Sequence, residues 1–330
     1  ICIFTKEPDA KTENRLNYLE KILKEKGFVV QTKRICSPRD NSFDFKTSIK
    51  DKSILLSIGS LNFQQLLERF DELLNTQNVA FNLDLTNEYI TEEYSKVLFK
   101  IIKEKPSLTF SFTYTFNNPS SSPYFPSANF ERQGFSIGLQ PTDLAKDCKS
   151  IDEWLGNIKK VWLEVISIFR NEDDFLGIDS SIAPLFKGNS SLINFIKRLF
   201  PSFNKSILTE TYLKITNFIK NENPRPIGLC GLMFPCLEDF ELAKEYELDN
   251  FSIERNIFLS LHSGLGIDTY PIGVDEDIKK VTNILKTIQG LSNKYRKPLS
   301  VRFVSDGKTK IGQKSDFKNQ YLKDVVIKRL

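Results

Sequence analysis

The chain has 330 residues, 40% of them hydrophobic, so it is long and apolar enough to bury a large core as a globular protein. Lysine and arginine total 46 against 42 for aspartate and glutamate, which leaves a net charge of +4 spread along the chain. Proteins that bind nucleic acids instead gather basic residues on one tract or face. The composition therefore argues against a nucleic-acid partner.

The cysteines indicate the redox state of the cellular compartment, and the apolar segments indicate whether the chain enters a membrane. The five cysteines are odd in number and mostly far apart, and none forms a Cys-x-x-Cys pair with histidines at zinc spacing. The opening residues, "ICIFTKEPD", lack the basic start and apolar core of a signal peptide. The longest charge-free span, residues 107–130, is too rich in Ser, Thr, Asn and Pro for a transmembrane helix. We expect a reduced, cytoplasmic protein with no membrane partner.

Strand and helix signals alternate along the first half of the chain. "ICIFT" precedes an amphipathic stretch near residues 13–26, "SILLSIG" precedes "FQQLLERFDELL", and "VAFNLDL" precedes "ITEEYSKVLFKIIKE". This pattern is typical of an α/β protein. Strict alternation over residues 108–116, "LTFSFTYTF", predicts a further strand.

The second half repeats this alternation after a long loop. "GFSIGL" predicts a strand, and the following helix has capping-box spacing between Ser150 and Glu153 and an apolar stripe through Trp154 and Trp162. Further strands are predicted at "FLGID", "PIGLCGLMFP", "NIFLSLHS" and "LSVRFVS". Although length alone favours two domains, we expect one continuous domain over residues 1–330, with about ten strands.

Four segments share one design, in which an apolar strand runs into glycine and a polar cluster. Ligands in α/β sheets and barrels bind beyond the carboxyl ends of strands, where such loops meet. We therefore expect these loops to form the rim of a ligand site. The four segments are residues 175–184 ("FLGIDSSIAP"), 227–239 ("IGLCGLMFPCLED"), 259–273 ("LSLHSGLGIDTYPIG") and 299–313 ("LSVRFVSDGKTKIGQ").

The acidic residues of these segments each allow two interpretations. Asp179, beside Ser181, is a candidate to orient a substrate or act as a general base, but a carboxylate there also caps a following turn or helix. Glu238 and Asp239 form a candidate acid/base pair, but they also fall in the first turn of a predicted helix, where the macrodipole favours negative charge. In both cases the structural interpretation is the commoner one.

The only histidine and a strand arginine are the other candidates. His262 lies six residues before Asp268, and the glycines between them allow a reversal in which the carboxylate orients the imidazole. A histidine bonded to a backbone carbonyl is the commoner alternative. Arg302 lies on a strand of a sheet covered on both faces, so it needs an anionic partner: Asp179, Asp268, or a ligand carboxylate or phosphate.

Metal and phosphate sites receive little support from the sequence. With one histidine, metal ligands would be carboxylates, which suit Mg²⁺ or Ca²⁺ better than Zn²⁺. The loop "DGKTKIGQK" superficially resembles a phosphate cradle but matches no Walker or dinucleotide pattern. We predict no metal and no cofactor.

The same four segments resemble a known family. "GIDSSIAP", "GLCGLMFPCLED", "SGLGIDTYPIG" and "VRFV" with its Gly/Lys loop occur in the order and spacing of the uncharacterised domain-of-unknown-function family seven-eleven, also described as pyruvate formate-lyase family proteins. Residues 122–144 are similar to that family's aromatic-proline loop and following strand, so the resemblance covers most of the chain, and it is closest to archaeal-type members.

The resemblance implies a ten-stranded α/β barrel similar to pyruvate formate-lyase-like glycyl-radical enzymes. It does not imply their chemistry, because after Arg302 the chain offers only Gly307 and Gly312, in a lysine-rich loop. Three places depart from the family's pattern: His262-Ser263 replaces a cysteine-containing pair of bacterial-type members, Asn129-Phe130 replaces Tyr-His, and Gly138-Leu139-Gln140 replaces Gly-Leu-Glu. The family's recurrent polar residues correspond here to Asp179, Ser181, Glu238, Asp239, Asp268 and Arg302.

These observations lead to one main hypothesis and two alternatives. The main one is an enzyme, or former enzyme, that binds a small anionic metabolite. The first alternative is a non-catalytic scaffold that binds a metabolite or a protein, in which Arg302 is fully paired and His262 lies away from the acidic residues. The second alternative is a divalent-metal-dependent hydrolase whose metal ligands are Asp179, Glu238, Asp239 and Asp268. We also expect a homo-oligomer, since a chain with 27 Phe exposes some of them. The catalytic candidates are His262, Asp268 and Asp179, and the binding candidates are Arg302, Ser181, Glu238 and Asp239.

Overall fold

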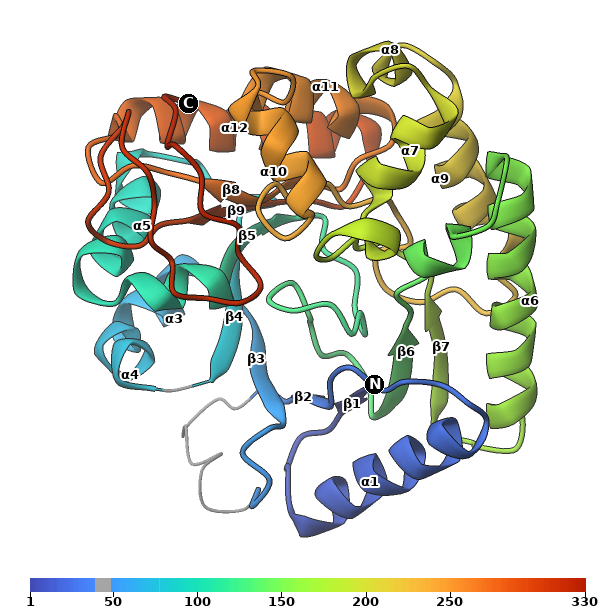
Figure 1. Cartoon of the computed structure of the whole chain (residues 1–330). Helices are drawn as coiled ribbons and strands as arrows, with labels where there is room; N and C mark the ends of the chain where they lie inside the picture. Colours follow the sequence, from blue (N-terminus) through green and yellow to red (C-terminus); the bar gives the residue numbers. More distant parts are fainter. Residues whose placement is uncertain (39–48, 77) are drawn as a thin grey trace.

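In the described part of the chain nine strands form one mixed sheet, which confirms the α/β class (Figure 1). The computed structural model describes residues 1–38, 49–76 and 78–330. The order across the sheet is β7-β6-β1-β2-β3-β4-β5-β9-β8. The strands are β1 (Cys2–Phe4), β2 (Arg34–Cys36), β3 (Leu55–Leu61), β4 (Val79–Asp84), β5 (Phe112–Phe116), β6 (Gly134–Gly138), β7 (Phe175–Asp179), β8 (Gly266–Pro271) and β9 (Leu299–Val304).

The sheet consists of parallel groups joined antiparallel. Strands β1 to β5 are parallel and lie in chain order, as the repeated strand-helix pattern predicts. The pairs β6·β7 and β8·β9 are also parallel. Two antiparallel pairings, β1 with β6 and β5 with β9, join these groups. The carboxyl ends of β6 to β9 therefore point opposite to those of β1 to β5.

Residues 226–235, predicted as a strand, are an irregular segment between the two sheet edges. Cys230 and Gly228 have positive φ (44° and 74°), and Pro226 and Pro235 have no N–H to donate, so a regular ladder does not form. The sheet is consequently not closed by a tenth strand. The segment makes only isolated parallel bridges, which join Ile178 to Pro226, Ile182 to Leu232, Leu232 to Gly264, and Pro235 to Asp268.

Helices cover the outer face of the sheet, and the connection between β5 and β6 runs on the inner side (Figure 1). The longest helix, α6, confirms its predicted cap and stripe: the Ser150 side chain accepts from the Glu153 N–H, and Trp154 and Trp162 are buried. The α-helices are α1 (Ala10–Glu25), α3 (Phe63–Glu68), α4 (Phe70–Asn75), α5 (Glu92–Glu104), α6 (Ile151–Phe169), α7 (Leu192–Leu199), α8 (Phe203–Ile207), α9 (Thr211–Glu222), α10 (Phe240–Glu247), α11 (Ile253–His262) and α12 (Ile278–Tyr295). Three 3₁₀ helices are η1 (Pro106–Ser111), η2 (Thr142–Ala145) and η3 (Gly188–Ser190).

Two further strand predictions are wrong. The alternating residues 108–116 are a strand only from Phe112, because the first half belongs to η1, which begins at Pro106. "NIFLSLHS" lies in helix α11, whose N-terminus is capped by the Ser252 side chain. A short apolar run is compatible with the repeat of a strand and with that of a helix. Here the N-terminal cap and the preceding helical residues stabilise the helix. The strand of this region is β8, which starts at Gly266.

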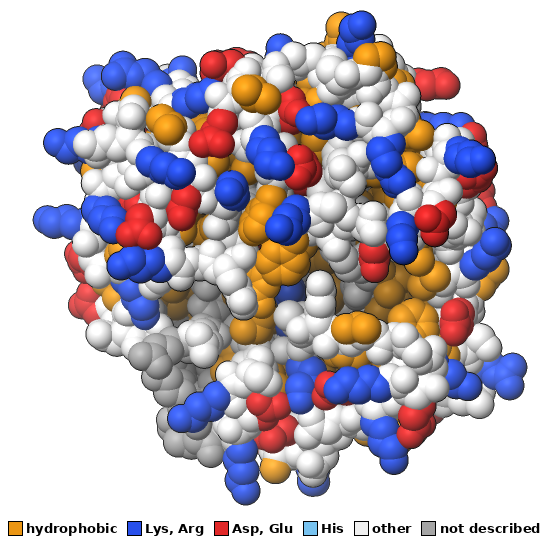
Figure 2. All heavy atoms as spheres, in the orientation of Figure 1, with side chains coloured by type: hydrophobic (Ala, Val, Ile, Leu, Met, Phe, Trp, Pro, Cys, Tyr) orange, Lys and Arg blue, Asp and Glu red, His pale blue; other side chains and the backbone are white. Residues whose placement is uncertain are grey.

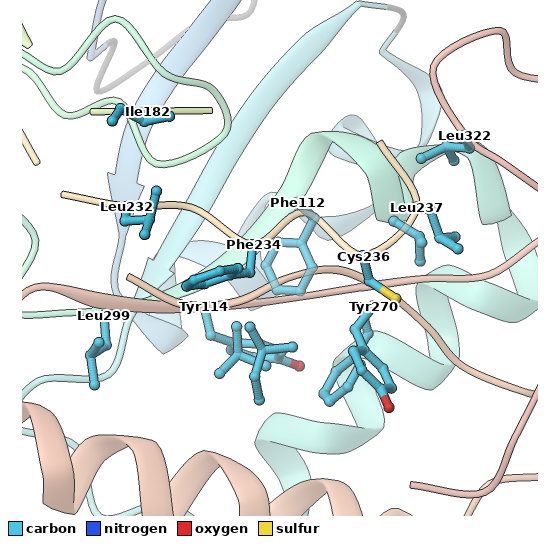
Figure 3. Packing of buried hydrophobic residues seen from close by; sticks show 14 of the residues in the cluster. Phe112, Tyr114, Ile182, Leu232, Phe234, Cys236, Leu237, Tyr270, Leu299 and Leu322 are labelled. Atoms are coloured by element: carbon cyan, nitrogen blue, oxygen red, sulfur yellow. The ribbon is translucent and has the colours of Figure 1, made fainter. Parts of the chain in front are cut away.

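The irregular segment is nevertheless part of the core. Figure 3 shows Phe234 beside Phe112 of β5, and both belong to one buried cluster with Leu232 and with Cys236 and Leu237, which follow the segment. Burial of these side chains stabilises the segment together with a few backbone hydrogen bonds, such as those from the Ile182 N–H to Gly231 and from the Leu265 N–H to Leu232. This packing fixes the backbone that carries Glu238 toward the interior. Among the described residues, no helix combines the length and the apolar character needed to cross a bilayer.

Candidate functional site

A cavity of about 830 Å³ lies on the inner side of the sheet. It is in the size range of small-molecule sites. Figure 2 shows hydrophobic side chains gathered in the hollow at the centre of one face of the molecule. The residues of the lining used below come from strands, loops and the C-terminal tail: Arg34, Phe110, Tyr124, Phe125, Phe186, Leu229, Met233, Phe234, Glu238, Leu265, Asp268, Arg302 and Tyr321.

Arg302, Asp268 and Glu238 form an ion-pair cluster on the cavity wall. The Arg302 Nε donates to Asp268 Oδ1 at 2.6 Å, and an Nη atom donates to Glu238 Oε1 at 3.1 Å. The other Nη donates to the Phe110 carbonyl at 3.2 Å. Of the partners expected for Arg302, the structure brings Asp268 to it and adds Glu238. The arginine charge is thus matched by two carboxylates.

A β-bulge places Asp268 in this cluster. The register between β8 and β9 shifts between Ile267 and Tyr270, so that Asp268 and Thr269 lie opposite the single residue Arg302. Thr269 has a positive φ of 39°. Bulges re-aim side chains and are frequent next to active sites. The local backbone thus directs the Asp268 carboxylate at the guanidinium.

Glu238 is a carboxylic acid of the cavity lining whose pKa is shifted toward neutrality. Burial raises its pKa to about 7, Arg302 opposes this shift, and Asp268 adds to it. Among the described residues, the only hydrogen bond its carboxylate accepts comes from Arg302. Its side chain is 14% exposed, toward the cavity. A carboxyl group that titrates near neutral pH is suited to accept and return a proton.

Arg34, at the start of β2, is a cavity cation that the sequence reasoning missed. Its Nε donates to the Thr32 hydroxyl at 3.0 Å and an Nη atom to the Pro123 carbonyl at 2.7 Å. The guanidinium carbon lies 5.1 Å from the Phe125 ring centre. Within the described ranges, no carboxylate approaches it within 4.0 Å. Its charge lowers the pKa of Glu238, so the two groups act on each other within the cavity.

The signal for Arg34 was present in the sequence. It precedes Ile35 in a short parallel strand, and the argument that an arginine there needs an anionic partner applies as it does to Arg302. Its neighbour Lys33 provides a contrast, because it pairs with Asp51 at 2.8 Å and Glu20 at 3.2 Å. Within the described residues, Arg34 therefore lies in the cavity without a carboxylate in ion-pair contact.

Asp179 and Ser181 lie behind the cavity wall and tie loops together. The fully buried Asp179 accepts from the Ser122 hydroxyl, from the Ser181 hydroxyl and N–H, and from the N–H groups of Leu229 and Cys230, at 2.6–3.0 Å. The Ser181 oxygen accepts in turn from the Gly231 N–H at 3.1 Å. Donors from the protein therefore occupy both Asp179 oxygens, and neither residue is part of the cavity lining.

Asp239 is the N-cap of α10, as the structural interpretation of its position predicts. Its carboxylate accepts from the Leu242 and Glu241 N–H groups and also from Ser191 and Ile193 at the start of α7. Burial raises its pKa to about 6, and the hydrogen bonds, led by that from Ser191, oppose this shift. The side chain faces two helix N-termini and is not part of the cavity lining.

His262 lies at the C-terminal end of α11, apart from the cavity. Its Nδ1 is 2.6 Å from the Ser263 hydroxyl, and its ring packs against Phe258. Burial and then Lys297 lower its pKa. Among the hydrogen bonds of the described residues, none joins His262 to Asp268, which instead pairs with Arg302.

Neither a carboxylate metal cluster nor a phosphate cradle is formed where the sequence suggested one. The described residues contain no group of three or more His, Cys, Asp or Glu side chains placed to hold a metal ion. In the glycine and lysine loop, Asp306 accepts from the N–H groups of Lys308, Thr309 and Asp316. An internal carboxylate therefore occupies the donors that would otherwise face a phosphate.

The fold is that of an α/β protein with a cavity in which acidic and basic side chains meet. Residues 57–318 match the family described as Uncharacterised ACR (DUF711), and the chain belongs to this family. A comparison with curated proteins found no match. The resemblance to archaeal-type members stays a prediction.

Proposed function

We propose that the chain is an enzyme that binds a small anionic molecule in the cavity, with Arg34 holding the anion and Glu238 exchanging a proton with the bound molecule. The observation that carries this proposal is the unmatched charge of Arg34 on the cavity wall. A partly buried guanidinium with free donors is a strong site for carboxylate or phosphate. An anion beside it supplies the missing partner.

Glu238 acts in this proposal through its pKa near neutrality. The carboxylate removes a proton from a ligand carbon next to a carbonyl, and the resulting carboxylic acid returns it. Arg302 and Asp268 position this group: Arg302 stabilises its ionised form, and the pair with Asp268 keeps the guanidinium in place when Glu238 is protonated. The role of proton carrier that the sequence suggested for His262, Asp268 or Asp179 thus belongs to Glu238 in this proposal, and Arg302 positions it.

We also propose that the fold is related to the ten-stranded α/β barrel of pyruvate formate-lyase-like enzymes, with the irregular residues 226–235 in the place of the tenth strand. Support comes from the isolated bridges of this segment to both edges of the sheet and from the antiparallel joining of β1·β6 and β5·β9. Radical chemistry is not part of the proposal, because no cysteine of the described chain is among the residues that line the cavity.

Calorimetric titration with small anions tests the binding step. We expect acetate, phosphate or phenylacetate to bind wild-type protein and to lose at least about tenfold in affinity in Arg34→Gln, because a charge-assisted contact is removed. Lys33→Gln is the matched control, since Lys33 is adjacent and already paired. Equal affinities in Arg34→Gln and wild type contradict the proposal. Thermal melting of each variant verifies that it is folded.

A non-catalytic binding module is the second candidate. It is favoured by the full pairing of Arg302 and by the distance of His262 from the acids, both expected of a scaffold. Proton exchange separates the two candidates. An enzyme exchanges the acidic C–H protons of bound phenylpyruvate in D₂O, followed by NMR, and Glu238→Gln abolishes this exchange. With a binding module, the exchange rate of phenylpyruvate in the presence of either protein equals the rate in D₂O buffer alone.

A further inference from the structure

Apolar side chains form part of the cavity lining, beside polar ones. Leu229, Met233 and Phe234 of the irregular segment and Leu265 before β8 face the cavity. The hydroxyl groups of a sugar phosphate find no hydrogen-bond partners on these apolar side chains. An apolar ligand group, in contrast, gains free energy by displacing water from them. The lining therefore favours a ligand with one anionic end and an apolar body.

Three nearly parallel aromatic rings form a column along the cavity. The ring centres of Phe110 and Tyr321 are 6.4 Å apart with planes at 11°, and those of Tyr321 and Phe186 are 5.6 Å apart at 21°. The guanidinium carbon of Arg302 lies 5.2 Å from the Phe110 ring centre. The rings come from η1, the loop after β7 and the segment after β9, so three distant chain segments supply one aromatic part of the lining.

Phe186 is held in this column by a constrained backbone. Its φ is +65°, a left-handed conformation that is uncommon for a bulky side chain. Its N–H donates to the Glu238 carbonyl at 2.6 Å, and its own carbonyl accepts from the Phe240 N–H at 2.9 Å. These bonds couple the ring to the backbone of the proton-exchanging residue. Such conformations persist where the surrounding structure enforces them.

Tyr321 is held by the packing of the tail. Leu322 is buried, and the Lys323 N–H donates to the Leu237 carbonyl at 3.0 Å. Figure 3 shows Leu322 next to Leu237, on the irregular segment that leads to Glu238. The tail residue is therefore placed with the same segment that carries the acid.

We propose that the ligand is a carboxylate with a flat, aromatic body, and that Tyr321 is the residue that selects it. The carboxylate binds Arg34, and the body lies along the column of Phe110, Tyr321 and Phe186. Aromatic rings gain by stacking beyond the burial of area, and a saturated ring of the same size loses that gain. This inference rests on the proposed function and specifies its substrate class.

Calorimetric titration of the full chain with phenylacetate and cyclohexylacetate tests it, because the two probes differ only in ring saturation. We expect phenylacetate to bind wild-type protein about threefold to tenfold more tightly. Tyr321→Leu removes this preference and Tyr321→Phe keeps it. Tyr295→Leu, at a half-exposed tyrosine at the end of α12, is the control and leaves the preference unchanged.

The outcomes separate this inference from the function on which it rests. Equal affinity of the two probes in wild-type protein, or an unchanged preference in Tyr321→Leu, overturns the aromatic class and leaves anion binding intact. Loss of the preference in Tyr295→Leu as well overturns the role of Tyr321. Binding of both probes to Arg34→Gln at wild-type affinity overturns the proposed function itself.

Discussion

Asp179 and Glu238 are carboxylates in similar surroundings with different partners. Both are largely buried, and Asp179 is the last residue of β7 whereas Glu238 follows the irregular segment. The Asp179 carboxylate accepts five hydrogen bonds, whereas that of Glu238 accepts one, from Arg302. The comparison teaches that burial alone does not identify a functional acid. The number of protein donors already bound to it separates a structural carboxylate from a reactive one.

Asp179→Ala gives the largest expected effect on this comparison. Removing the carboxylate leaves five donor contacts without their acceptor, and the free energy of unfolding falls by about 5 kcal/mol. Urea denaturation followed by circular dichroism measures the loss. The control is Asp173→Ala, at an exposed acid just before β7. A loss below about 1 kcal/mol contradicts the structural role of Asp179.

Arg302→Met gives the next largest effect. It leaves Asp268 and Glu238 buried without a cation, and we expect a loss of about 3 kcal/mol at pH 8. Adding Glu238→Gln to this variant removes one of the two unpaired charges and restores part of the stability. A double-mutant cycle by urea denaturation measures the coupling. Strictly additive effects would show that the two side chains do not interact.

The pH dependence of stability tests the proton affinity of Glu238. Its pKa is about 7 in the folded protein and near 4.5 ordinarily, so the folded state binds the proton more tightly. The resulting stabilisation is fully present below pH 4.5 and is lost as the pH rises through 7. Relative to Glu238→Gln, wild-type protein should lose about 2 kcal/mol between pH 5 and pH 7.5. Parallel pH profiles of the two proteins contradict the raised pKa.

His262→Gln gives the smallest expected effect. The ring is partly exposed, and its hydrogen bond is to the next residue, so the free energy of unfolding changes by less than about 0.5 kcal/mol. Binding of phenylacetate should also be unchanged, because His262 lies apart from the cavity lining. A tenfold loss of affinity in this variant would show that His262 contributes to ligand binding.

Local patterns in the sequence predicted the parts of the fold that depend on neighbouring residues. The cap and stripe of α6 and the alternation of strands with helices follow from residues within one or two turns. The apolar run in α11 failed because five residues fit both periods, and the tenth strand failed because backbone conformation at Gly228 and Cys230 breaks the ladder.

The sequence predicted the ion pair between Arg302 and Asp268 as one of its alternatives, and the two residues lie on adjacent strands. Glu238 as the second partner required the path of the irregular segment, which tertiary packing sets. Arg34 was missed because its significance is the absence of a carboxylate nearby among the described residues, and a sequence does not show which charges remain unmatched.

The tail that carries Tyr321 also determines when the cavity can exist. The contact between Phe110 and Tyr321 joins the early and late parts of the chain, and β5 finds its neighbour β9 only after Val304 has been made. During translation, β1 to β5 emerge first and wait with one edge of β5 unpaired. The wall of the cavity is therefore complete only after Tyr321 has been made, and a nascent chain that stops before this residue lacks the ring that joins Phe110 to Phe186.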